Sequence, residues 1–76
     1  MAYPDKEELF MNDNILARLR IEKHMTQSQL SAASGVHEMA ISRLERGERP
    51  LSNLRLSTAL ALADALEVDP HIFLTE

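Results

Sequence analysis

The chain has 76 residues, no cysteine, 12 acidic and 8 basic side chains, and a formal net charge of -4. This length allows one domain, and the lack of cysteine excludes disulfides, cysteine-ligated zinc and a nucleophilic thiol. The hydrophobic fraction of 45% is ordinary for a globular fold, yet no apolar run is long enough to span a bilayer and no secretory signal is visible. We therefore expect a folded cytoplasmic domain with no membrane association, and the net charge taken alone argues against nucleic-acid binding.

The composition favours helices over strands, because leucine and alanine dominate the apolar residues while valine and aromatic residues are scarce. Residues 1–11 are expected to form a tail, with Met11 as an alternative start, and residues 12–76 to form the domain. Asn12 or Asp13 can N-cap a first helix, because short polar side chains bond the free backbone N–H groups at a helix start. The apolar stripe of this helix is expected at Ile15, Leu16 and Leu19.

A second helix is predicted from Thr26, because Thr26 and Gln29 have the spacing of a capping box. It should end at Gly35, where a left-handed glycine can turn the chain sharply. A third helix is predicted from His37 to Gly47, with Ile41 and Leu44 facing inward.

Residues 48–54 are predicted to form a loop, because they include a proline, a serine and an asparagine. A fourth helix should follow from about Leu56 to Glu67, with a buried stripe of Leu56, Ala59, Leu60, Ala63 and Leu66. Asp69 followed by Pro70 is typical of a helix start, which predicts a short fifth helix over residues 69–74.

The spacing around Gly35 is that of a DNA-binding helix-turn-helix, in which the second helix of the pair is free to enter a major groove. Ser31 is small enough for the second helix to cross over it, and Gly35 permits the tight turn between the helices. The remaining diagnostic positions are apolar and fill the wedge between the two helices: Leu30, Val36, Ile41 and Leu44.

Taken in register, these residues and their flanking motifs resemble the Cro/C1-type helix-turn-helix domains, also called the XRE family. The flanking motifs are Leu19-Arg20, Thr26-Gln27, the stretch from Ile41 to Glu45 with Gly47, and the alanine- and leucine-rich stretch 59–68. The resemblance covers roughly residues 12–74. It implies an all-α, five-helix, lambda-repressor-like fold and a transcriptional regulator that binds double-stranded DNA, most simply a repressor, without a cofactor.

The sequence departs from the family pattern at several positions. His37 stands where a capping serine or aspartate is usual, so the third helix is expected to be less well capped. Glu67 stands where glycine is common, and the loop before the fourth helix is longer than usual. Glu38 and Met39 stand where uncharged polar side chains are frequent, which leaves the target sequence open.

Nine residues are candidate DNA contacts. On the third helix, Arg43 can bond guanine, Glu38 can accept from cytosine, Met39 and Ala40 can touch a thymine methyl, and Ser42 can bond a base or a phosphate. Backbone phosphate contacts are expected from Gln27 at the start of the second helix and from Arg46, Arg49 and Asn53, with Arg55 as a further member of that cluster. The alternative for each is a solvent-facing residue, and for Glu38 an acid favoured by the helix dipole alone.

Glu45 is expected to serve the structure instead, with Arg20 as its partner, although a solvated acid is an equally good interpretation. The three histidines lack metal-ligand spacing, and no nucleophile elbow or phosphate loop is present, so neither a metal site nor an enzyme is expected.

The apolar residues Ile72, Phe73 and Leu74 either cap the core or form a two-fold interface. A homodimer would place two recognition helices about 34 Å apart, as a palindromic operator requires. The alternative function is a protein-interaction adaptor or an antitoxin with a toxin or other protein partner, which the net negative charge and Glu38 favour.

Dividing the charge by segment weakens the argument against nucleic acid. Residues 1–15 carry -3 and residues 59–76 carry -4, whereas residues 16–58 carry +3. The segment with the helix-turn-helix is therefore basic, and one side of the domain is expected to face DNA.

Overall fold

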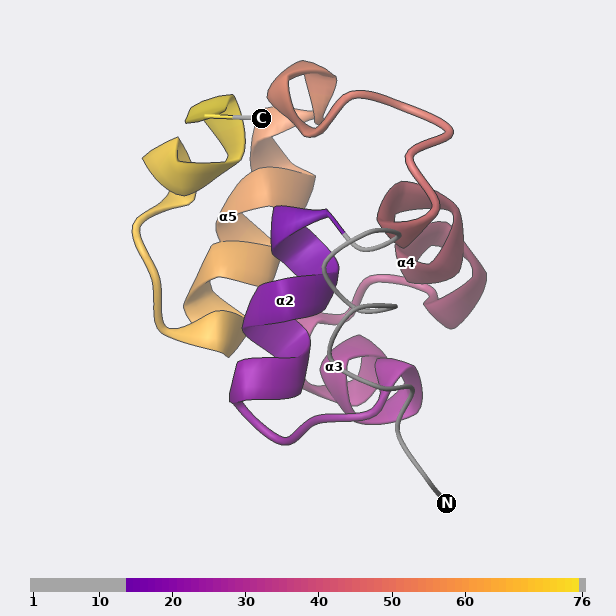
Figure 1. The fold of residues 1–76 in the computed structure, drawn as a ribbon. Helices are drawn as coiled ribbons and strands as arrows, with labels where there is room; N and C mark the ends of the chain where they lie inside the picture. Colours follow the sequence, from indigo (N-terminus) through magenta and orange to yellow (C-terminus); the bar gives the residue numbers. More distant parts are fainter. Residues whose placement is uncertain (1–13, 76) are drawn as a thin grey trace.

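The structure is a computed structural model that describes residues 14–75; the expected tail at residues 1–11 and the expected caps Asn12 and Asp13 lie outside the described residues. The described part forms four α-helices, α2 (Ile15–Glu22), α3 (Gln27–Ser34), α4 (Glu38–Glu45) and α5 (Leu56–Leu66). Two 3-10 helices follow α4 and α5: η1 (Leu51–Asn53) and η2 (Pro70–Thr75). No strand occurs between residues 14 and 75, so the all-α prediction is confirmed (Figure 1).

The first described helix begins one residue later than a cap at Asp13 would place it, and two residues later than a cap at Asn12 would. Asn14 is the N-cap of α2, and its side-chain oxygen accepts a hydrogen bond from the Ala17 backbone N–H at 3.1 Å. Asparagine and aspartate cap helices about equally well, so residue type alone did not distinguish Asn14 from the two predicted caps that precede it.

The predicted capping box at the start of α3 is present. The Thr26 hydroxyl accepts from the Gln29 N–H at 3.0 Å, and the Gln29 side-chain oxygen accepts from the Thr26 N–H at 2.8 Å. Two backbone donors that the helix leaves unpaired are thereby satisfied. This cap fixes where the helix pair α3–α4 begins.

Three helices end in the same hydrogen-bonded turn, in which one residue is left-handed. The left-handed residues are His24 after α2 (φ 57), Gly47 after α4 (φ 76) and Glu67 after α5 (φ 59). In each case the next backbone N–H bonds the carbonyl five residues earlier, for example Glu48 N–H to Arg43 O at 3.2 Å. Glycine adopts this conformation without strain, whereas histidine and glutamate each lose about 1 kcal/mol or more.

The core lies between all the described helices. It consists of the buried residues Leu16, Leu19, Leu30, Ile41, Leu44, Leu51, Leu62, Ala63, Leu66 and Phe73. Helix α3 packs against both α4 and α5, and α2 packs against α4. The helix pair α3–α4 is therefore held in place by its packing against α2 and α5.

The predicted buried stripe of α5 is partly wrong. Leu56 and Leu60 are 70% and 42% exposed, whereas Leu62, Ala63 and Leu66 are buried. Helix α5 is rotated relative to the prediction, because the predicted stripe followed the spacing of leucine and alanine, whereas Leu60 lies on the exposed face marked by Ser57 and Asp64. Two leucines consequently lie on the surface.

The predicted short fifth helix is present as the 3-10 helix η2. Its start is capped as expected, because an Asp69 side-chain oxygen accepts from the His71 N–H at 2.9 Å. Phe73 is buried in the core, Ile72 packs partly against it, and Leu74 is 62% exposed. In Figure 1, η2 and α4 lie on opposite sides of the view, with α5 between them.

Candidate nucleic-acid interface

The turn between α3 and α4 is three residues long and is held by side chains at both ends. Gly35 is left-handed (φ 77), as predicted, and its N–H bonds the Ser31 carbonyl at 2.8 Å. The Ser34 hydroxyl accepts from the Val36 N–H at 3.1 Å. The His37 ring Nδ1 accepts from the Met39 N–H at 3.1 Å, so the side chain of His37 does cap the start of α4.

Helix α4 presents an exposed face whose residues are spaced by one helical turn. Ile41, Leu44 and Glu45 are buried, while Met39, Arg43 and Arg46 lie on the solvent side at positions i, i+4 and i+7. Met39 is 60% exposed, which is high for a large apolar side chain. The face that the core leaves free therefore carries two arginines and an apolar anchor.

A groove of about 470 Å³ runs beside this face, and we call it the arginine groove. Its lining residues come from α4, the following loop and the start of α5: Ala40, Arg43, Leu44, Glu48, Arg49, Pro50, Asn53, Leu54, Arg55 and Thr58. Three arginines and one glutamate give the lining a positive balance. Guanidinium groups bind phosphate oxygens through two parallel N–H donors, so this lining suits a phosphate backbone.

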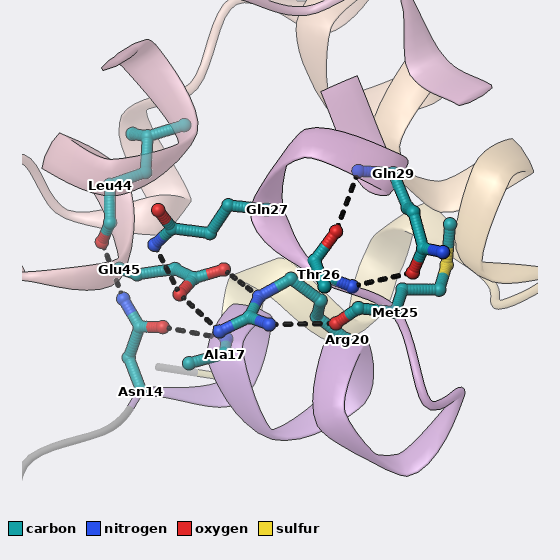
Figure 2. A network of polar contacts seen from close by, with 9 residues as sticks. All are labelled: Asn14, Ala17, Arg20, Met25, Thr26, Gln27, Gln29, Leu44 and Glu45. Atoms are coloured by element: carbon teal, nitrogen blue, oxygen red, sulfur yellow. Dashed lines mark hydrogen bonds and ion pairs between the residues drawn. The ribbon is translucent and has the colours of Figure 1, made fainter. Parts of the chain in front are cut away.

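A buried polar network holds the inner side of α4 (Figure 2). The Arg20 guanidinium donates to both Glu45 carboxylate oxygens, at 2.7 and 3.0 Å, and also to the Met25 carbonyl at 2.7 Å. The exposed fractions of the two charged side chains are 12% and 7%, so this pair is shielded from water. The predicted pairing of Arg20 with Glu45 is confirmed, and it ties α2 to the end of α4.

Gln27 belongs to the same network. Its side-chain Nε2 donates to a Glu45 carboxylate oxygen at 3.0 Å, and the residue is half-buried (Figure 2). A primary amide carries two hydrogens, so one N–H remains for a phosphate. Any phosphate contact by Gln27 would therefore be made by a side chain that its hydrogen bond to Glu45 already orients.

The structure brings four of the nine candidate residues together in the arginine groove: Ala40, Arg43, Arg49 and Asn53. Glu38 and Met39 are exposed at the start of α4, and Ser42 is half-buried. Arg46 pairs with Glu48 at 2.9 Å, but both side chains are more than half exposed, and such surface pairs exchange partners at little cost.

Sequence reasoning missed two contributors near this surface. Thr58 lines the arginine groove from α5, and no motif marked it in advance. Asn14 donates from its side-chain Nδ2 to the Leu44 carbonyl at 2.6 Å, thirty residues away. Its neighbours Asn12 and Asp13 had the same capping chemistry, so only the position of the helix start distinguishes it.

None of the helices between residues 14 and 75 is long and apolar enough to cross a membrane. In the same part of the chain, no three histidine, aspartate or glutamate side chains gather in a way that could hold a metal ion.

Comparison with known proteins places this geometry in a family. The family model described as "Helix-turn-helix" matches residues 16–73. A protein of Sinorhizobium fredii named as an uncharacterized HTH-type transcriptional regulator is 46% identical over 52 residues. That match covers 68% of this chain and 64% of the relative, so the chain spans slightly under two thirds of the relative's length. The chain belongs to the Cro/C1-type (XRE) helix-turn-helix family.

Proposed function

We propose that the chain is a sequence-specific DNA-binding regulator of transcription, in its simplest use a cytoplasmic repressor, that inserts residues 37–46 into the major groove of an operator. The observation that carries the proposal is the exposed stripe of Met39, Arg43 and Arg46 beside the arginine groove. This arrangement combines side chains for base edges with side chains for the flanking phosphates. No enzymatic activity or cofactor forms part of the proposal.

Base contacts are assigned to the exposed side of α4. Arg43 bonds guanine O6 and N7 through its fork, while Met39 and Ala40 touch thymine methyl groups. Glu38 accepts from cytosine N4, and Ser42 bonds a base or an adjacent phosphate. The phosphate contacts are assigned to Gln27, Arg46, Arg49 and Asn53, with Arg55 added because it lines the same groove.

The regulator is proposed to act as a homodimer. The exposed leucines Leu56, Leu60 and Leu74 support this, because a small domain gains stability by covering such apolar side chains. They lie on α5 and η2, and in Figure 1 η2 is on the opposite side from α4, which would leave both recognition helices open.

Fluorescence anisotropy with labelled duplexes tests the proposal. The probe is a duplex selected by the wild-type chain from a random 20-base-pair library, because no operator is known in advance. Binding should weaken steeply with rising salt, since each phosphate contact releases bound counterions. Absent binding, or binding that salt does not affect, would refute the proposal.

A second candidate function is a protein-interaction adaptor or antitoxin whose main partner is a protein. It is favoured by a second, mainly apolar groove of about 180 Å³ between η1, the start of α5 and η2, lined in part by Leu54, Leu56, Phe73 and Leu74. The double variant Arg43→Ala/Arg49→Ala separates the two functions. It should abolish DNA binding under the first and leave partner binding unchanged under the second.

A further inference from the structure

The side chain of Asn14 bonds two helices at once. Its oxygen accepts from Ala17 N–H at the start of α2, at 3.1 Å, and its nitrogen donates to the carbonyl of Leu44 near the end of α4, at 2.6 Å. Figure 2 shows the amide between the two helix ends. We propose that Asn14 is a positioning residue that sets the angle of α4, and this inference rests on the proposed function.

The two helix ends that meet at Asn14 have opposite partial charges. The start of α2 presents backbone N–H groups and the end of α4 presents backbone carbonyls, which the regular hydrogen bonds of an α-helix do not use. The Leu44 carbonyl also accepts from Gly47 N–H at 3.1 Å, so both of its lone pairs are used. An amide can accept from one helix end through its oxygen and donate to the other through its nitrogen.

The Asn14 contact complements the ion pair of Arg20 with Glu45. Asn14 and Arg20 are six residues apart, which is about 9 Å along the axis of α2. Core packing of Ile41 and Leu44 holds α4 in place, and the ion pair at Glu45 adds a polar attachment at its end. The hydrogen bond from Asn14 to the backbone of the preceding residue is a further attachment, which opposes a rotation of α4 about Glu45.

A small rotation of α4 about its C-terminal end displaces its N-terminal end. Glu38 lies six residues from Leu44, about 9 Å along the axis, so a rotation of 10° moves the start of α4 by about 1.5 Å. Recognition sites tolerate displacements of only about 0.5 Å. Asn14 therefore acts on base recognition without lying near the bases.

Two variants remove the Nδ2 donor while keeping the cap of α2. Asn14→Ser caps well but is too short to reach Leu44, and it adds no charge. Asn14→Asp has the same shape, and its charge favours the start of α2, but it places a second acceptor against the Leu44 carbonyl. Ala61→Gly on α5 is the control, because it weakens a helix outside the network and outside the arginine groove.

The readout is the ratio of affinities for the duplex selected on the wild-type chain and for its base-scrambled counterpart, measured well below the unfolding transition. We expect both Asn14 variants to lower this ratio about fivefold, the effect of one hydrogen bond, while the control retains it. A loss of folded protein would weaken both duplexes equally. An unchanged ratio in the Asn14 variants, or an equal loss in the control, would overturn the proposal.

Amide NMR spectra of the free protein give a second, DNA-independent result. A change in the angle of α4 should shift the amide signals of residues 38–40, at the end of α4 away from Asn14, in both Asn14 variants. Shifts confined to the neighbours of residues 14, 44 and 47 would overturn the positioning role. If the wild-type chain binds no duplex, the proposed function fails, and these spectra still decide whether Asn14 sets the helix angle.

Discussion

The buried ion pair between α2 and α4 makes the sharpest prediction about stability. The Glu45 side chain is 7% exposed, and Arg20→Ala would leave its carboxylate with Gln27 as the remaining side-chain donor. The same substitution would remove the side-chain donor to the Met25 carbonyl. Removing one member of a buried pair typically costs about 3–5 kcal/mol, because the other charge stays buried without compensation. The bidentate geometry, at 2.7 and 3.0 Å, places this pair in that class.

That loss is large for a domain of this size. A stability of about 0.05–0.15 kcal/mol per residue gives a chain of 76 residues about 4–11 kcal/mol in total. We therefore expect Arg20→Ala to remove about a quarter or more of the free energy of unfolding. The double variant Arg20→Met/Glu45→Leu should cost much less than Arg20→Ala, because it leaves no unpaired charge.

Urea unfolding followed by circular dichroism at 222 nm measures these differences. With a slope of about 1 kcal/mol per molar urea, the midpoint for Arg20→Ala should fall by about 3–5 M, which for a weakly stable domain means unfolding in buffer. Glu45→Gln keeps the shape of the side chain, and its urea midpoint should lie between those of Arg20→Ala and the double variant. A loss below about 1 kcal/mol for Arg20→Ala would refute the argument, as would a double variant at least as unstable as the single one.

Four further predictions concern separate features. Gly35→Ala should cost about 1 kcal/mol in thermal unfolding, because no atom lies within 4 Å of the added Cβ and only the left-handed backbone opposes it; a loss above about 3 kcal/mol would indicate a clash instead. Phe73→Ala should cost about 3–5 kcal/mol in urea unfolding, because it empties a site that is 1% exposed. The hydrogen bonds from the backbone and ring of His71 lower the pKa of the exposed Asp69 carboxyl in the folded state. The ionised carboxyl therefore stabilises the fold at a pH above the pKa of the unfolded state, and this contribution is lost as the pH falls through the pKa of the folded state. An NMR titration should therefore find the pKa of Asp69 below 3.8 in the wild type and closer to the unshifted value after His71→Ala. Arg49→Ala should weaken binding to all duplexes alike and reduce the salt slope by about one, whereas a change in base preference would contradict a phosphate role.

The helix-turn-helix could be predicted because its signals are local. The capping box of Thr26 and Gln29 and the left-handed turn at Gly35 depend on residues within four positions of one another. Such contacts are encoded by spacing, so the sequence alone gave the correct partners. Pairing Arg20 with Glu45, twenty-five residues apart, needed the family resemblance as well.

Two features were not predicted, for different reasons. The buried side of α5 was assigned wrongly at Leu56 and Leu60, because leucine and alanine recur on every side of this helix and their spacing was followed, although Ser57 and Asp64 mark the exposed face. The contact of Asn14 with Leu44 uses a backbone carbonyl, which every residue carries, so no residue type indicated it.

The candidate site was only partly accessible to sequence reasoning. The exposed face of α4 follows from helical periodicity once Ile41 and Leu44 are placed in the core. The arginine groove depends on how the loop folds back toward α5, which brings Arg55 and Thr58 beside Arg43. The cluster of Arg49, Asn53 and Arg55 was predicted because these residues are close in sequence, but loop paths are set by packing, so the proximity of Thr58 to Arg43 could not be predicted.

The left-handed residues His24 and Glu67 make this domain amenable to engineering. Each occupies a backbone conformation that glycine adopts without strain, so His24→Gly and Glu67→Gly each have about 1 kcal/mol of stability to gain, less the entropy that glycine loses on folding. Both lie at one end of the molecule, where Lys23 Nζ is 3.8 Å from a Glu67 carboxylate oxygen. Neither residue lines the arginine groove, so thermal tolerance and DNA affinity can be adjusted as independent properties of the same small scaffold.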